Sequence, residues 1–479
     1  MQMKQEVTEK KLRTGLGQFI FPFSIEPNKR ESMISQLVSD GYEPFYLNKM
    51  ELEKKYYGSE FNVSHQRMER YFLPFTSNVL FPHEDDPDAM QRFSKKLDLE
   101  CELNTPFHAI PFRILSIDVM LCPFDLGFIT IRTELAGESI VLSTALEFAS
   151  RLRVLQDVTD QDCQTSIQHD GVDYEEVEKF IFQKLASGIL PFLDKSGMEG
   201  AYFETLPYFM DERMYCIFFY GLEEGEQYIQ NDLYRVARLD GYDMDGKPFI
   251  SSSNPDYIQR YCEIHSYNRW APDTNYIVNE HTFACITNQT EGRMRHLANQ
   301  MFGEYYYGLL LNMFHKIVLL KLSNCYSHVR MARDNDAIED LIRNITKFSS
   351  KYFFLELVSQ SQGREIFIMM RRIFNNNELY QDVKQTLMDL FKYQERFASR
   401  NQNYLLMILT LYTVVGGIYG MNQVIEDLKG DIDWGKMGGY SVFEYIALFI
   451  TFSGLLVGFL LGAHVIRRYV KEQIKKNKQ

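Results

Sequence analysis

The sequence predicts an α/β domain followed by a long stalk helix and two C-terminal transmembrane helices, and three observations lead to this prediction. Strand-like and helix-like apolar patterns alternate over the first half of the chain. Neither glycine nor proline occurs from residue 378 to residue 415, as is typical of one continuous helix. No charged residue occurs in residues 401–425 or 445–466, so each stretch can cross about 30 Å of hydrocarbon as a helix.

Length and composition exclude several classes of protein. The chain has 479 residues and a formal net charge of −13, so its surface is acidic. Binding to phosphate backbones needs clustered lysine and arginine, and we therefore expect no nucleic acid partner. The 7 cysteines form no Cys-x-x-Cys pair, which is typical of reduced packing residues. The N-terminal residues contain no apolar run of the length that a secretory signal needs.

We predict that residues 1–240 form the α/β domain, on the cytosolic side. Four ranges rich in isoleucine, valine and phenylalanine read as two hairpins of strands: 112–122 with 126–134, and 201–210 with 214–222. Between the hairpins, residues 142–156 and 174–192 have the apolar spacing of helices. Glycine, serine, proline and asparagine accumulate from residue 240 to residue 273, which indicates a long loop or a boundary.

A helical cytosolic region is expected over residues 241–374. Beyond residue 288, apolar residues recur at intervals of three to four and no proline occurs before the membrane. Residues 309–322 are apolar enough to suggest another span, but His315, Lys316 and Lys321 interrupt them. We therefore expect a helix that is buried on one face.

Five segments are predicted at the C-terminal end. They are a stalk helix (375–402), transmembrane helix 1 (403–422), an external loop (423–442), transmembrane helix 2 (443–466) and a basic cytoplasmic tail (467–479). Lysine and arginine precede the first span and follow the second, whereas the loop is acidic. By the positive-inside rule, both termini lie in the cytoplasm of a multi-pass protein of the plasma (inner) membrane, with the lipid bilayer as a partner.

One face of the first span carries mainly polar side chains. At helical spacing, this face consists of Ser399, Gln402, Leu406, Thr410 and Thr413. Facing an axis shared by several subunits, such a stripe lines a water-filled path, and a ring of Leu406 side chains can gate it by excluding water. Alternatively, the hydroxyl groups bond to their own helix or join neighbouring helices.

Tyr419-Gly420-Met421-Asn422 ends the first span, and a short loop, a last span and a basic tail follow. This arrangement resembles the CorA family of magnesium and cobalt channels. The resemblance implies a homopentameric funnel, a selectivity filter of Asn422 side chains framed by Gly420 and Met421, and Mg²⁺ as the transported ion, with Co²⁺ as a second candidate. Magnesium holds its water tightly, so neutral carboxamide oxygens suit the recognition of the hydrated ion.

Two acidic groups are candidate cation sites. Glu426, Asp427, Asp431 and Asp433 in the external loop are expected to attract cations to the pore mouth, unless they are only polar loop residues. Glu84, Asp85, Asp86 and Asp88 are a candidate regulatory metal site, for which a solvated turn is the alternative.

No motif of an enzyme occurs in the chain. Walker, G-x-G-x-x-G, H-E-x-x-H and nucleophile-elbow patterns are missing from the sequence, and its histidines are isolated. We therefore expect no enzyme and no organic cofactor, with Mg²⁺ as the transported ion and as the candidate regulatory ion.

Three functions stay open. The first is a divalent cation channel of the CorA type. The second is a membrane effector on the same scaffold that a small cytosolic ligand gates, such as a nucleotide messenger in CRISPR-associated relatives; the large region before the spans favours it. The third is a non-conducting interaction protein.

Overall fold

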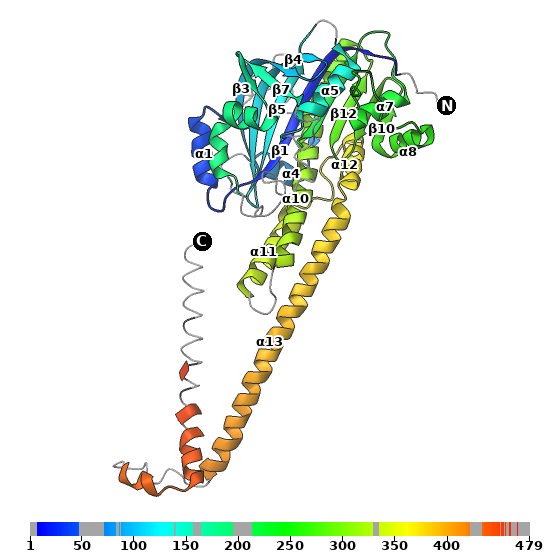
Figure 1. The fold of residues 1–479 in the computed structure, drawn as a ribbon. Coiled ribbons are helices and arrows are strands. Elements are labelled where there is room, and N and C mark those ends of the chain that lie inside the picture. The colour runs from blue at the N-terminus through cyan, green and yellow to red at the C-terminus, as the bar shows by residue number, and fades with distance from the viewer. Residues whose placement is uncertain are drawn as a thin grey trace. The chain divides into compact units, whose positions relative to one another are not determined.

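The protein folds into two compact units, Met1–Thr386 and Leu387–Gln479. The computed structural model describes residues 7–46, 71–82, 86, 88–137, 140–156, 164–194, 213–328, 335–421 and 434–450, and residues 452–454, 456, 459, 460 and 467. A large sheet with helices on both faces makes up the first unit (Figure 1). The described part of the second unit is helical.

A 12-stranded sheet forms the centre of the first unit. Ten strands follow one another in the order β10 (Ser266–Trp270), β11 (Thr274–Val278), β12 (Thr282–Thr287), β9 (Tyr215–Leu222), β1 (Lys11–Ser24), β5 (Leu126–Leu135), β4 (Ala109–Cys122), β3 (Gln91–Asn104), β7 (Ser166–His169) and β8 (Val172–Tyr174). The short strands β2 (Glu43–Phe45) and β6 (Ile140–Val141) pair with β3 and β1. Among the described strands, β9 and β12 pair in parallel and all other pairs are antiparallel.

One face of the sheet carries a large apolar core. Side chains alternate between the faces of a strand, so Phe19 and Phe21 of β1 lie on this face together with Ile117 and Ile129 of the neighbouring strands. Helices on this face contribute further core residues. They are α1 (Arg30–Ser39), α5 (Leu142–Leu152), α6 (Val177–Phe180), the π-turn η2 (Ile181–Leu185), the 3-10 helix η3 (Ser187–Phe192) and α7 (Gln230–Arg238).

The opposite face holds polar side chains and a second helical layer. Its helices are α4 (Pro74–Leu80), α9 (Glu291–Gln300), the π-turn η5 (Met301–Tyr305), α10 (Tyr306–His328), α11 (Asn335–Lys351) and α12 (Ser361–Ile373). The hydroxyl groups of Tyr306 and Thr130 are hydrogen-bonded at 2.8 Å, and the rings of Tyr215 and Phe374 lie 5.7 Å apart. These contacts join helices of the layer directly to the strands.

Helix α13 (Asn376–Met421) is the longest element, with 46 residues. It follows Asn375, whose φ of 58° lies in the left-handed region and separates α12 from α13. The prediction of one long helix without glycine or proline up to residue 415 is confirmed. A 3-10 helix, η7 (Trp434–Gly439), and a helical stretch over residues 442–450 lie further along the chain.

The predicted fold class, an α/β domain within a CorA-like funnel, is wrong. The hairpin of residues 112–122 and 126–134 is confirmed as β4 and β5, and the strand within 214–222 as β9, whereas residues 201–210 lie outside the described residues. However, β3, β4 and β5 follow one another as antiparallel neighbours, which need no crossover helix. The result is a mixed and largely antiparallel sheet.

The predicted membrane topology is also corrected. Among the described residues, no helix combines the length and the apolar composition that crossing a membrane requires. A span needs about 20 consecutive apolar residues, and the described side chains of α13 beyond residue 400 and the helix over 442–450 fall short of this. The prediction of two spans and of a multi-pass place in the plasma membrane is therefore wrong for the described chain.

Two smaller predictions also need correction. The expected loop over residues 240–273 contains a helix, α8 (Pro255–His265), because Asn254 accepts hydrogen bonds from the backbone N–H groups of Asp256 and Tyr257 and so caps it. The helix expected over 309–322 is part of α10 and is buried on more than one face, since residues 306–315 are all buried.

Candidate functional site

The structure describes only part of the predicted filter. Gly420 and Met421 are the last residues of α13, whereas Asn422 lies outside the described residues. Glu426, Asp427, Asp431 and Asp433 of the predicted external loop lie outside them as well. Passage of cations through a ring of Asn422 therefore stays a prediction.

The predicted pore-lining residues lie on α13 and are exposed. The hydroxyl groups of Thr410 and Thr413 each donate a 2.7 Å hydrogen bond to the carbonyl oxygen four residues earlier. This is the backbone bonding that the sequence left open as the alternative.

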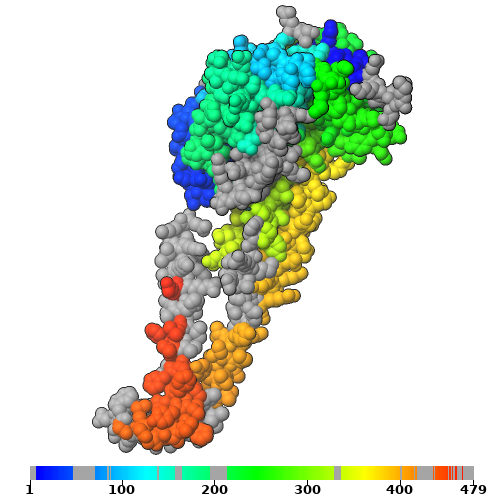
Figure 2. All heavy atoms as spheres, in the orientation of Figure 1, coloured from blue at the N-terminus to red at the C-terminus, as the bar shows by residue number. Residues whose placement is uncertain are grey.

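Exposed apolar side chains surround α13 at this level. Leu406 is 59% exposed, and the large apolar residues at the three following positions are 45% to 63% exposed. Figure 2 shows this orange part of α13 with side chains at the surface. Four consecutive positions point to different sides of a helix, so the apolar surface is not confined to one face.

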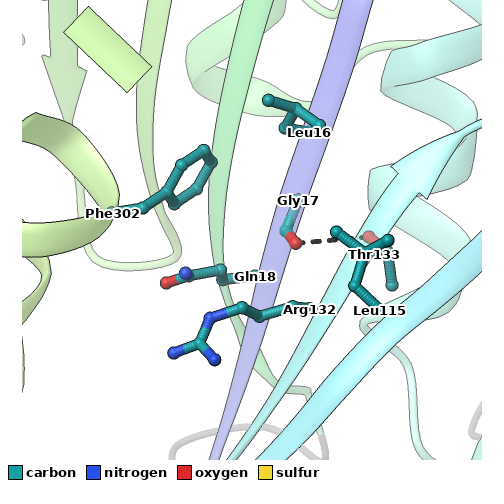
Figure 3. Close-up of a pocket in the computed structure, with 7 residues that line it drawn as sticks. All are labelled: Leu16, Gly17, Gln18, Leu115, Arg132, Thr133 and Phe302. Atoms are coloured by element: carbon teal, nitrogen blue, oxygen red, sulfur yellow. Dashed lines mark hydrogen bonds between the residues drawn. The ribbon is translucent and has the colours of Figure 1, made fainter. Parts of the chain in front are cut away.

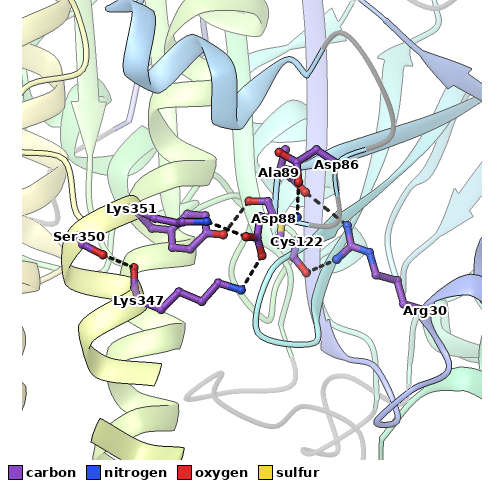
Figure 4. Close-up of polar contacts among 9 residues, drawn as sticks. Arg30, Asp86, Asp88, Ala89, Cys122, Lys347, Ser350 and Lys351 are labelled. Carbon is purple, nitrogen blue, oxygen red and sulfur yellow. Dashed lines mark hydrogen bonds and ion pairs between the residues drawn. The ribbon is translucent and has the colours of Figure 1, made fainter. Parts of the chain in front are cut away.

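The carboxylates of Asp86 and Asp88 already bind other groups of the protein. Glu84 and Asp85 lie outside the described residues. Lys347 and Lys351 contact the Asp88 carboxylate at 2.5 and 2.7 Å, and Asp86 accepts the backbone N–H of Asp88 (Figure 4). Two hydrogen bonds lower the pKa of Asp88, and the one from Lys347 has a larger effect than the one from Lys351. Within the described chain, no group of three or more metal-ligating side chains occurs.

A different site lies between the sheet and helix α9. It is a cavity of about 200 Å³, which we call the interlayer cavity. Its lining residues come from three neighbouring strands and α9: Arg13, Thr14, Leu16, Glu134, Phe219, Glu291, Met294, Arg295 and Ala298. Leu16 pairs with Glu134 on one side and with Phe219 on the other, so one cross-strand row forms the sheet side.

Two arginine side chains meet on one carboxylate at this cavity. Arg13 Nη2 lies 2.5 Å from Glu291 Oε2, and Arg295 Nη2 lies 2.7 Å from Glu291 Oε1. All three side chains are about half exposed, between 46% and 53%. The formal charges of these three side chains sum to +1, and with Glu134 the charged side chains of the lining sum to zero.

The remaining carboxylate of the cavity, Glu134, pairs with an arginine outside the lining. Glu134 accepts a 2.7 Å hydrogen bond from Arg113, and this bond raises the pKa of Arg113. Arg113 also lies 3.6 Å from Asp98, so Glu134 shares this arginine with a second carboxylate.

A second, smaller pocket follows along the same strands. Its volume is about 10 Å³, room for roughly one water molecule, and Leu16 lines it as well as the interlayer cavity. The side chains of Gln18, Arg132 and Phe302 converge on this space (Figure 3). Gln18 Oε1 is buried there and accepts no hydrogen bond from the described residues.

Next to this pocket lies a buried charge cluster of Arg92, Asp118 and Arg132. Arg92 Nη2 lies 3.0 Å from Asp118 Oδ2, and Arg132 forms an ion pair with the same oxygen. Burial alone raises the pKa of Asp118, but Arg132 and Arg92 outweigh burial and hold it below its usual value. Asp118 is therefore ionised, and the cluster carries a net charge of +1.

Helix α10 contacts the buried charge cluster through Tyr307. Arg92 donates a 2.6 Å hydrogen bond to the Tyr307 hydroxyl, and Ser94 donates one of 2.5 Å to Asp118. The π-turn η5, which carries Phe302, lies just before this contact. A π-turn inside a helix occurs often at functional sites.

The sequence contains a signal for the buried charge cluster. Asp118 and Arg132 are charged residues inside ranges predicted as apolar strands, and a charge in such a range indicates a buried partner of opposite charge. Arg13, Glu291 and Arg295 have no such signal, because polar residues at strand and helix ends are common.

The comparisons with known proteins add no relatives: no protein-family model matches the chain, and no curated protein or solved structure matches it significantly. The resemblance to CorA therefore depends on the C-terminal motif alone and stays a prediction.

Proposed function

We propose that the first unit is a receptor for a small anionic ligand, which binds in the interlayer cavity and contacts Arg13 and Arg295. The observation that carries this proposal is the pair of arginines that share one carboxylate, Glu291, at a cavity of about 200 Å³. The proposal takes up the ligand-binding part of the second function that the sequence left open.

The two arginines favour an anion over other ligands. Guanidinium groups bind carboxylates and phosphates through paired hydrogen bonds, and Arg13 and Arg295 already bind a carboxylate, that of Glu291, at this cavity. An incoming anion would replace or join Glu291 between the two arginines.

The other lining residues of the cavity indicate which kind of ligand fits beside the arginines. Leu16, Phe219, Met294 and Ala298 supply apolar and aromatic surface beside the arginines. Pockets for drug-sized molecules measure about 300 Å³ or more. A cavity of about 200 Å³ therefore suits a compact ligand with one anionic group and a small apolar body.

Isothermal titration calorimetry on the full chain tests the proposal. Inorganic phosphate, benzoate and adenosine monophosphate serve as probes of anions with and without an aromatic body. We expect at least one probe to bind, and we expect the double variant Arg13→Ala, Arg295→Ala to weaken this binding about tenfold or more, because charge-assisted hydrogen bonds are lost.

Arg343→Ala is the matched control, because Arg343 is 71% exposed and pairs with Asp340 on α11, away from the cavity lining. It should leave the affinity unchanged. Equal affinity in the double variant, or no binding of any probe, would overturn the proposed receptor.

A further inference from the structure

Helix α9, the π-turn η5 and helix α10 form one uninterrupted helical run from Glu291 to His328. Glu291, Met294, Arg295 and Ala298 line the interlayer cavity at the beginning of this run. Its later part passes through the buried helical layer. A displacement at the cavity therefore acts on a continuous helical run that extends into the core.

The π-turn lies between two fixed parts of this run. Before it are the cavity residues of α9, and directly after it Tyr306 and Tyr307 hydrogen-bond to Thr130 and Arg92 of the sheet. A π-turn holds one residue more than an α-helical turn, so it can take up a change of register between the two flanking helices. All five of its residues, Met301–Tyr305, are buried.

Helix α10 holds the beginning of α13 through one pair of asparagines. Asn376 Nδ2 donates to the main-chain oxygen of Asn312 at 3.0 Å and to its Oδ1 at 3.1 Å. Asn312 Nδ2 in turn donates to the carbonyl oxygen of Gly308 at 2.9 Å, and both asparagine side chains are fully buried. Asn376 is the first residue of α13, so this pair positions the start of the helix.

Other contacts at the same turn come from α12 and the loop before it. Arg371 Nε donates to Asn377 Oδ1 at 2.6 Å, and the ring of Tyr380 stacks on Phe353 at 3.8 Å. These contacts do not involve α10. The Asn312–Asn376 pair is therefore a hydrogen-bonded link that joins the start of α13 to the helical run of the interlayer cavity.

We infer that filling the interlayer cavity is passed through η5 and α10 to the first turns of α13, where it loosens the Asn312–Asn376 pair. A group in the cavity pushes α9 away from the row of Leu16, and a change of register in η5 passes this shift on to α10. Asn312 then moves relative to Asn376, which α12 keeps in place. This inference rests on the proposed receptor and assigns its regulated element.

Hydrogen–deuterium exchange of residues 376–386 in the full chain tests the inference. Two perturbations are compared with the untreated protein: inorganic phosphate in excess, and the substitution Ala298→Phe, which fills the cavity from α9 without any ligand. We expect exchange of this segment to become about tenfold faster with the filled cavity, because two hydrogen bonds are weakened. Met294→Trp fills the same cavity if Ala298→Phe does not fold.

A second set of variants interrupts the proposed path from the cavity to α13, which we call the relay, at the Asn312–Asn376 pair. In Asn312→Ala or Asn376→Ala, exchange of residues 376–386 is fast from the beginning and no longer responds to the filled cavity. Asn324→Ala, an exposed asparagine on α10, is the matched control and keeps the response. Two variants at the pair are used because either one leaves a buried amide without its partner and can impair folding.

The outcomes separate this inference from the proposed receptor. Unchanged exchange of residues 376–386 in a folded Ala298→Phe or Met294→Trp protein overturns the relay, whether or not phosphate binds. A response to the filled cavity together with no binding of any anion overturns the receptor and leaves the relay standing. A response that persists in Asn312→Ala and Asn376→Ala also overturns the relay.

Discussion

Asp118 accepts ion pairs from two arginines of neighbouring strands, and Arg92 is one of them, with Nη2 3.0 Å from Asp118 Oδ2. The two side chains are 1% and 3% exposed, so neither can exchange its partner for water. Both charges lie on the face of the sheet that α10 covers. The pair therefore couples the packing of the second helical layer to the charge state of one carboxylate.

Asp118→Asn should destabilise the first unit by about 3–5 kcal/mol, because removing one partner leaves buried arginines without their counter-charge. Urea unfolding measures this loss. Asp98→Asn is the matched control: Asp98 lies 3.6 Å from Arg113, both side chains are about half exposed, and the expected loss is below about 1 kcal/mol. Equal losses of stability in the two variants would show that the buried ion pairs do not stabilise the first unit.

The same carboxylate predicts a dependence on pH. The pKa of Asp118 is below its usual value in the folded protein, so its contribution is complete above the unfolded value of about 3.9 and is lost as the pH falls through the folded value. The difference in stability between the unchanged protein and Asp118→Asn should stay constant from pH 7 to pH 5 and shrink below about pH 4. Urea unfolding at these pH values checks this, and a difference that grows in acid would contradict it.

Two glycine substitutions should change the stability of the protein in opposite directions. A Cβ atom at Gly127 would lie 2.2 Å from the ring of Phe23, which is buried, and Gly127→Ala should cost about 1–3 kcal/mol through overpacking. At Gly308, inside α10, a Cβ atom would meet no atom within 4 Å. Gly308→Ala should therefore stabilise the protein by about 0.5–1 kcal/mol. Thermal unfolding separates the two, and destabilisation by Gly308→Ala would contradict the packing around α10.

The ion pairs of Asp88 should hold helix α11 against the rest of the first unit. Asp88→Asn removes both lysine pairs, and we expect faster hydrogen exchange in α11, with a modest cost of about 1 kcal/mol or less for each half-exposed pair. Asp340→Asn, which removes an exposed pair within α11, is the control and should leave the exchange unchanged.

Adding magnesium to this experiment tests the predicted regulatory metal site. An ion bound by Asp86 and Asp88 would displace Lys347 and Lys351 and speed the exchange of α11. Exchange that does not respond to magnesium in the unchanged protein would argue against the metal site.

The apolar surface of α13 should drive self-association, since exposed apolar patches of this kind mark interaction surfaces. Leu406→Ser together with Leu409→Ser should lower the molecular mass of the particle, measured by analytical ultracentrifugation in mild detergent. Gln402→Ser on the same helix is the control and should keep the mass. A mass that stays the same in the double leucine variant would place the association surface elsewhere.

Local patterns were enough to predict several elements. The runs of isoleucine, valine and phenylalanine in β4 and β5 and the lack of glycine and proline in α13 predict these elements without knowledge of their partners. Strand β3 was missed although apolar and charged residues alternate over residues 97–103, which is the pattern of a half-buried strand. Strand β1 was missed because Gly15, Gly17 and Pro22 interrupt it, although its central place in the sheet protects it on both sides.

The sequence by itself therefore determined where the long helix runs, which strands form the central hairpin and that the chain carries an acidic surplus. Only the tertiary structure decided the order of the strands and the candidate site. Arg13, Glu134 and Arg295 are far apart in the chain, and they line one cavity because β1 pairs with β5 and α9 contributes to the same lining. Periodicity records which face of an element is buried, whereas pairing between distant strands depends on how the whole set of apolar faces is covered at once.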